Sequence, residues 1–176
     1  AEMEPWITSV LETLDPSKTL VVDASVGVDM IASDHEDADH EEDADHEDEN
    51  DHEGTDPHYW LDPNNAIIMV SNVEVALSKR LPEQTTFFNE NASKLTHDLE
   101  ALDQAIVEAV ERFDSKTILS GGHFAFGYFA HRYGLENVSP YEGFSPDAEP
   151  TPQKIAQLID TISSTKAKAI YYEELI

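Results

Sequence analysis

Four histidines recur in one short acidic stretch, and each of them stands between an aspartate and a glutamate. Imidazole flanked by carboxylates is a suitable ligand set for zinc and for its neighbours in the first transition series. The spacing fixes no single coordination geometry, so the stretch predicts several exchangeable accessory sites. The four triplets are Asp34-His35-Glu36, Asp39-His40-Glu41, Asp45-His46-Glu47 and Asp51-His52-Glu53.

Two other interpretations of the triplets remain open. Carboxylates also suit calcium, but the repeats do not follow the EF-hand pattern, which requires a glycine at the sixth position. The histidines can also be incidental members of a solvated acidic tether. Their regular insertion favours metal binding over that interpretation.

Negative charge is concentrated in the same stretch. The chain has 176 residues and a net charge of -27, with 37 acids against 10 bases, and 14 of the acids but none of the bases fall between Asp34 and Asp56. This stretch has almost no apolar residues and cannot form a packed core, so we expect a disordered loop over residues 33–56. The charge argues against nucleic acid and anionic membrane surfaces as partners, because both are bound through Lys and Arg. With no cysteine in the chain, histidines and carboxylates must supply any transition-metal site.

Two further histidines stand in settings that restrict their side chains. His58 lies between Pro57 and Pro63, among aromatic and apolar neighbours that would exclude water from the imidazole. A single histidine of this kind is more often a structural residue than a ligand. His123 follows Gly121-Gly122 at the carboxyl end of a predicted strand, which is where α/β sheets place their ligands. His123 is therefore the stronger of the two candidates on local grounds.

Strands and helices alternate along the second half of the chain, which predicts a parallel α/β sheet. The apolar run Leu20-Val21-Val22 predicts a buried strand before the acidic stretch. His97 and His131 fall on predicted helices, and we expect both at the surface. The predicted helices cover residues 62–81, 83–113, 124–133 (ending at Gly134) and 151–164, and the later strands cover residues 117–120, 135–139 and 169–172.

Several of these segments together resemble one family, the zinc- and manganese-specific substrate-binding proteins of bacterial ABC importers, also called cluster A-I binding proteins. The resemblance is closest to the zinc-uptake branch and extends over nearly the whole chain in the right order. Residues 56–63 look like the family's DPHxWLDP segment, and residues 123–135 look like its HxAFGYFxxxYGL segment. Shorter likenesses are Glu4-Pro5-Trp6, Glu149-Pro150-Thr151-Pro152 and Ile170-Tyr171-Tyr172-Glu173-Glu174.

The resemblance implies a fold of two parallel-sheet α/β lobes joined by one long rigid helix. Residues 1–82 would be the end part of the N-terminal lobe, including the loop at 33–56. Residues 83–113 would be the linking helix, and residues 114–176 the first part of the C-terminal lobe. The metal ion would lie between the lobes, with His58 as the ligand from the first and His123 as the ligand from the second.

The function that the resemblance implies is extracytoplasmic capture of Zn²⁺, in preference to Mn²⁺, and its delivery to the membrane permease of an ABC transporter. We expect a monomer in the periplasm or at the cell surface, no catalytic residue and no resident organic cofactor. The signal sequence, a further histidine before Glu4 and a carboxylate near the end of the family's chain are not in this sequence, so we expect a fragment that lacks both ends.

Three alternatives accompany this interpretation. A manganese receptor on the same scaffold is the nearest, although imidazole ligands favour zinc. A metal-buffering or adhesive surface protein would use the acidic loop as its functional part. A metalloenzyme would need a positioned general base, and no HExxH or comparable motif is present.

Overall fold

The computed structural model describes residues 6–32, 55–122, 124–140, 150–165 and 169–172. The chain divides into two compact units, each built from separate parts of the sequence. The first unit comprises Ala1–Asp29, Pro57–Lys116 and Tyr128–Leu135, and the second comprises Met30–Asp56, Thr117–Gly127 and Glu136–Ile176.

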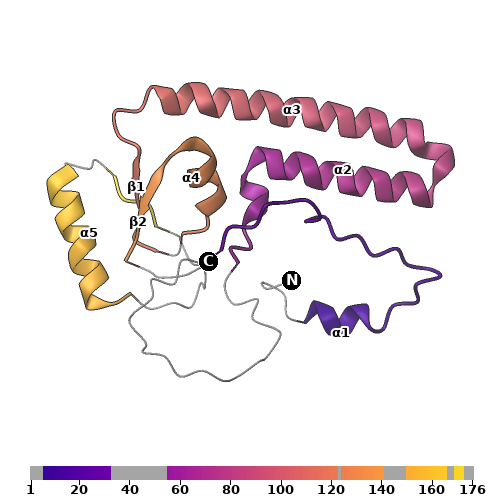
Figure 1. Ribbon diagram of the computed structural model, residues 1–176, viewed down its shortest axis with the longest axis horizontal. Coiled ribbons are helices and arrows are strands. Elements are labelled where there is room, and N and C mark those ends of the chain that lie inside the picture. The colour runs from indigo at the N-terminus through magenta and orange to yellow at the C-terminus, as the bar shows by residue number, and fades with distance from the viewer. Residues whose placement is uncertain (1–5, 33–54, 123, 141–149, 166–168, 173–176) are drawn as a thin grey trace, which may run out of the picture. The chain divides into compact units, whose positions relative to one another are not determined.

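Two helices that pack side by side form the main part of the first unit (Figure 1). The helix α2 (Pro63–Arg80) begins where the sequence predicts, because Asp62 accepts a hydrogen bond from the backbone N–H of Asn64 at 2.8 Å and Pro63 occupies the first turn. After Arg80 the short 3-10 helix η2 (Pro82–Gln84) reverses the chain, and α3 (Thr85–Glu111) runs back along α2. The predicted long helix is thus confirmed, apart from its first turn, which is η2.

The short helix α4 (Gly127–Tyr133) also contributes to the first unit and buries Tyr128, Ala130 and Tyr133. It ends at Gly134, whose φ is 62°. Leu135 N–H donates to the carbonyl of Ala130 at 2.8 Å across this residue, which is the hydrogen bond of a Schellman cap. The predicted helix end at Gly134 is therefore confirmed, while the helix begins three residues later than predicted.

A small parallel sheet lies in the second unit. Its strands are β1 (Thr117–Leu119) and β2 (Glu136–Val138), with Thr117 opposite Glu136. The segment around Tyr171 continues the sheet through a single parallel bridge to Ser120, with Gly121 N–H donating to the Tyr171 carbonyl at 2.7 Å. The helix α5 (Pro152–Thr165) follows β2 in the chain and buries Leu158. The α/β class is confirmed by this arrangement.

The predicted strand over Leu20-Val21-Val22 is not formed. These three side chains are 45%, 53% and 40% exposed, and no strand in the part of the chain that the structure describes pairs with them. The following turn is instead held by Asn72 of α2, whose side-chain amide donates to the carbonyls of Ala24 and Val26, each at 2.9 Å.

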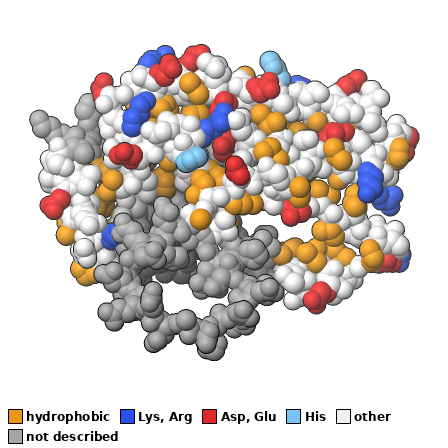
Figure 2. All heavy atoms as spheres, in the orientation of Figure 1, with side chains coloured by type: hydrophobic (Ala, Val, Ile, Leu, Met, Phe, Trp, Pro, Cys, Tyr) orange, Lys and Arg blue, Asp and Glu red, His pale blue; other side chains and the backbone are white. Residues whose placement is uncertain are grey.

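Hydrophobic side chains are also exposed on the helices. Figure 2 shows them over the α2–α3 hairpin, among acidic and basic groups. The exposed members on these two helices include Val73, Val75, Leu77, Phe87, Leu95 and Leu102. The short helix α1 (Ile7–Leu11) has no buried residue. Of the helices in the described ranges, none combines the length and the apolar composition needed to cross a membrane.

Replacing Gly134 with alanine is expected to lower the free energy of unfolding by about 1 kcal/mol, because a Cβ is strained in the left-handed region. Among the described residues, no atom beyond the glycine and its chain neighbours lies within 4 Å of the added Cβ, so the loss isolates the backbone effect. Gly134→Asn should lose less, since asparagine tolerates this conformation. Urea unfolding of the full-length protein and both variants measures the difference, and a Gly134→Ala variant as stable as the parent would contradict it.

Candidate metal-binding site

His58 is held in a tight turn at the entrance to α2. It precedes the 3-10 helix η1 (Tyr59–Leu61), and its carbonyl accepts the N–H of Leu61 at 3.1 Å. The next hydrogen bond of the turn runs from Asp62 N–H to the carbonyl of Tyr59 at 3.3 Å. Two overlapping backbone hydrogen bonds therefore span the chain from His58 to Asp62, and α2 begins immediately after them.

The side chain of His58 is buried, with 6% of the residue exposed. Its ring centroid lies 5.6 Å from that of Trp60, with the two planes inclined at 56°. Trp60 itself is 42% exposed. The expectation that His58 is shielded from water is confirmed by its burial.

The acidic stretch is joined to the protein at a narrow base. Ala32 and Thr55 form an antiparallel bridge, and Asp56 N–H donates to the carbonyl of Ile31 at 2.9 Å. Asp56 is fully buried. Thr55 and Asp56, which we predicted as the last residues of the loop, thus belong to the paired base. Both ends of the acidic stretch meet three residues before His58 in the chain.

The other predicted metal ligands lie outside the described residues. These are His123 of the transport site and His35, His40, His46 and His52 of the acidic stretch. His97 and His131 are exposed, as predicted. Within the described ranges, no three His, Asp, Glu or Cys side chains are grouped so that they could hold a metal ion.

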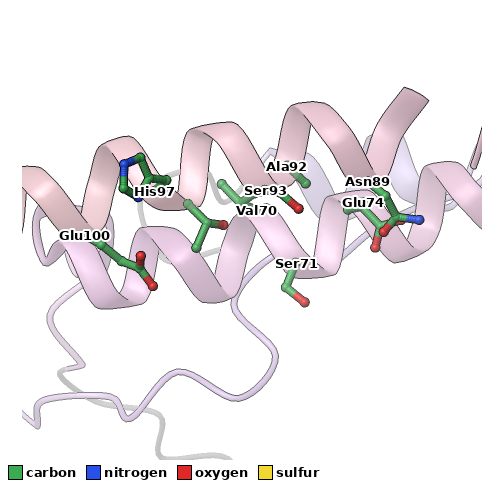
Figure 3. A pocket seen from close by; sticks show the side chains of 9 residues that line it. Val70, Ser71, Glu74, Asn89, Ala92, Ser93, His97 and Glu100 are labelled. Carbon is green, nitrogen blue, oxygen red and sulfur yellow. The ribbon is translucent and has the colours of Figure 1, made fainter. Parts of the chain in front are cut away.

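A shallow groove of about 280 Å³ runs between α2 and α3 (Figure 3). It contains three titratable side chains, Glu74, His97 and Glu100. Glu74 lies beside Asn89, and His97 and Glu100 lie toward the other end of the groove. The three side chains do not converge on one point, which agrees with the absence of a metal-binding group among the described residues. His58 is not among the residues that line the groove.

One arginine links the His58 turn to α3 and α4. Arg132 of α4 donates two hydrogen bonds to the carboxylate of Asp103 on α3, from Nε to Oδ1 at 2.6 Å and from Nη2 to Oδ2 at 2.7 Å. Tyr133 donates a third, from its hydroxyl to Oδ1 at 2.7 Å. Arg132 Nε also lies 3.4 Å from Oδ1 of Asp62, the residue that caps α2. Sequence reasoning missed this network, because no local pattern connects residues 103 and 132.

The network changes the protonation properties of its members. The hydrogen bonds from Arg132 hold the pKa of the Asp103 carboxyl below its usual value, against the opposing effect of burial. The same contact raises the pKa of Arg132. Burial, together with the bond to Asp103, raises the pKa of Tyr133. The carboxylate of Asp103 is thus ionised and the phenol of Tyr133 neutral at physiological pH.

Comparison with known proteins identifies the class. The model of the ZnuA family, zinc-uptake complex component A periplasmic, matches residues 1–176, and the chain belongs to this family. The resemblance noted from the DPHxWLDP and HxAFGYFxxxYGL segments is thereby confirmed.

Individual relatives agree with this assignment. The zinc-binding lipoprotein AdcA of Streptococcus pneumoniae is 36% identical over 173 residues, which cover 98% of this chain and 33% of AdcA. The high-affinity zinc uptake system protein ZnuA of Bacillus subtilis is 32% identical over 173 residues, which cover 98% of this chain and 53% of ZnuA. The crystal structure of AdcAII of Streptococcus pneumoniae superposes with a TM-score of 0.76 at 26% identity, over 97% of this chain and 57% of AdcAII. The chain thus spans between a third and somewhat over half of the length of these relatives.

Unfolding at acidic pH should measure the contribution of ionised Asp103 to stability. The folded-state pKa of Asp103 is lowered, so its contribution to stability is present above the unfolded-state pKa of about 3.9 and is lost as the pH falls through the folded-state value. At neutral pH, Asp103→Asn is expected to lower the free energy of unfolding by about 1–3 kcal/mol, and the loss should shrink toward low pH.

The matched control for this prediction is Asp98→Asn, which removes a carboxylate from an exposed position of the same helix. Urea unfolding of the full-length protein between pH 7 and pH 2 measures both variants. A loss in Asp103→Asn that stays constant over the whole range would contradict the prediction.

Proposed function

We propose that this chain is part of an extracytoplasmic receptor that captures Zn²⁺ and delivers it to the membrane permease of an ABC importer. The observation that carries the proposal is the buried, restrained imidazole of His58 in a chain that matches a zinc-uptake family over its whole length. The names of the relatives support it further, because AdcA is a zinc-binding lipoprotein and ZnuA belongs to a high-affinity zinc uptake system.

In this function the ion is cargo, and no covalent bond is made or broken. His58 and His123 each donate one imidazole nitrogen to Zn²⁺, and further ligands complete the coordination that zinc prefers. Nitrogen ligands favour zinc over manganese. A net charge of -27 attracts cations to the protein surface and repels anionic partners. The receptor acts as a monomer in the periplasm or at the cell surface.

The acidic stretch serves as an accessory collector. Its histidines, His35, His40, His46 and His52, bind metal weakly and exchange it. The paired base formed by Ala32 and Thr55 supports this role, because it returns the stretch to the protein close to His58 in the chain.

A competitive Zn²⁺ titration against a chromophoric chelator tests the proposal in the full-length protein. The forms compared are the parent, a deletion of residues 34–54, His58→Ala and His123→Ala, with His97→Ala as the matched control for loss of an exposed histidine. We expect the deletion to keep one tight site and to lose the weaker ones. His58→Ala and His123→Ala should each weaken the tight site by at least about tenfold, and His97→Ala should not.

A different pattern would identify a metal buffer. If the deletion abolished tight binding while His58→Ala and His123→Ala retained it, the function would reside in the acidic stretch, and the receptor proposal would be wrong. Tight binding of Mn²⁺ with only weak binding of Zn²⁺ would instead assign the same scaffold to manganese.

A further inference from the structure

We propose that Arg132 is a positioning residue for His58. It holds the turn that carries the imidazole in one orientation and thereby sets the affinity of the site for the metal ion. The proposal rests on the function proposed above and adds to it a residue that acts through the turn, not as a ligand.

The guanidinium of Arg132 lies between carboxylates from two distant parts of the sequence. It binds Asp103 with two parallel hydrogen bonds of 2.6 and 2.7 Å, the bidentate geometry in which arginine–carboxylate pairs are most specific. Its Nε is also 3.4 Å from Asp62 Oδ1. Because Asp103 lies on α3, its two hydrogen bonds hold the Arg132 guanidinium against that helix. The guanidinium in turn restricts the position of the Asp62 carboxylate.

Asp62 passes this restraint to His58 through the backbone. Its side chain accepts the N–H of Asn64 and so begins α2, while its own N–H donates to the Tyr59 carbonyl. The His58 carbonyl in turn accepts the N–H of Leu61. Because these two overlapping bonds join His58 to Asp62, we expect a displacement of Asp62 to displace the imidazole as well.

Partial burial strengthens the electrostatic interactions among Arg132, Asp103 and Asp62. The side chains of Arg132, Asp103 and Asp62 are only 23%, 19% and 15% exposed, so solvent and salt screen them less than surface groups. Removing the guanidinium would leave two carboxylates facing each other across the space that it now occupies. Their repulsion would push Asp62, and the turn with it, away from α3.

Lysine cannot reproduce this arrangement. Its ammonium group is a compact charge on a flexible stem, whereas the planar guanidinium presents several donors in a fixed fork. Arg132→Lys therefore keeps the charge and loses the geometry, and Arg132→Gln loses both. Comparing the two separates electrostatic attraction from orientation.

The test uses the full-length protein and competitive Zn²⁺ titration, with thermal unfolding measured in parallel. Arg132→Gln is expected to weaken the tight site by roughly tenfold or more, as loss of outer-shell support commonly does, and Arg132→Lys by a smaller factor. The matched control is Asn72→Ala, which removes two hydrogen bonds to the Ala24 and Val26 carbonyls elsewhere in the first unit. It should lower the unfolding temperature without changing the zinc affinity.

A double-mutant cycle decides whether the effect passes through His58. In a His58→Ala background, adding Arg132→Gln should cause no further loss of affinity. An equal loss in both backgrounds, or a similar loss in Asn72→Ala, would overturn the positioning role and leave the receptor function intact. If His58→Ala alone bound zinc as tightly as the parent, both the proposed function and this proposal would be wrong, so the two failures are distinguishable.

Discussion

The first backbone N–H groups of an α-helix have no intrahelical partners and need acceptors from elsewhere. In α2 the carboxylate of Asp62 supplies that acceptor, and the same Oδ1 that receives the Asn64 N–H lies 3.4 Å from Arg132. A carboxylate held by two contacts keeps one rotamer. Asp62 Oδ1 therefore restrains both the start of α2 and the end of the His58 turn.

The network also resolves a problem of charge. With 37 acids and only 10 bases, carboxylates in this chain repel one another far more often than they find a cation. Arg132 brings Asp62 and Asp103 together, and Tyr133 adds a neutral donor that does not increase the positive charge. Three groups from different segments can therefore pack with little exposure to water.

Sequence reasoning succeeds here where the determining interaction is local. Asp62-Pro63 predicts the start of α2, Gly134 predicts the end of α4, and the alternation of strands and helices predicts the parallel pairing of β1 and β2. The first two depend on capping and backbone conformation and can be read within a few residues, and the third depends on the order of elements along the chain.

It fails where the interaction joins distant segments. Leu20-Val21-Val22 has the composition of a strand, but a strand also needs a neighbour, and composition does not supply one. The contact between Asp103 and Arg132 spans 29 residues and has no periodic signal. The burial of His58 could be predicted from its aromatic neighbours, whereas its role as a ligand, and that of His123, stay predictions.

Because Ala32 and Thr55 are bridged, the number of residues between them can change separately from the folded units. The entropy of closing a loop grows only with the logarithm of its length, so doubling the segment between these residues costs about 0.6 kcal/mol. Copies of the Asp-His-Glu triplet can therefore be gained or lost with little effect on the folded units. The number of histidines that the chain carries can therefore change while the turn around His58 is kept.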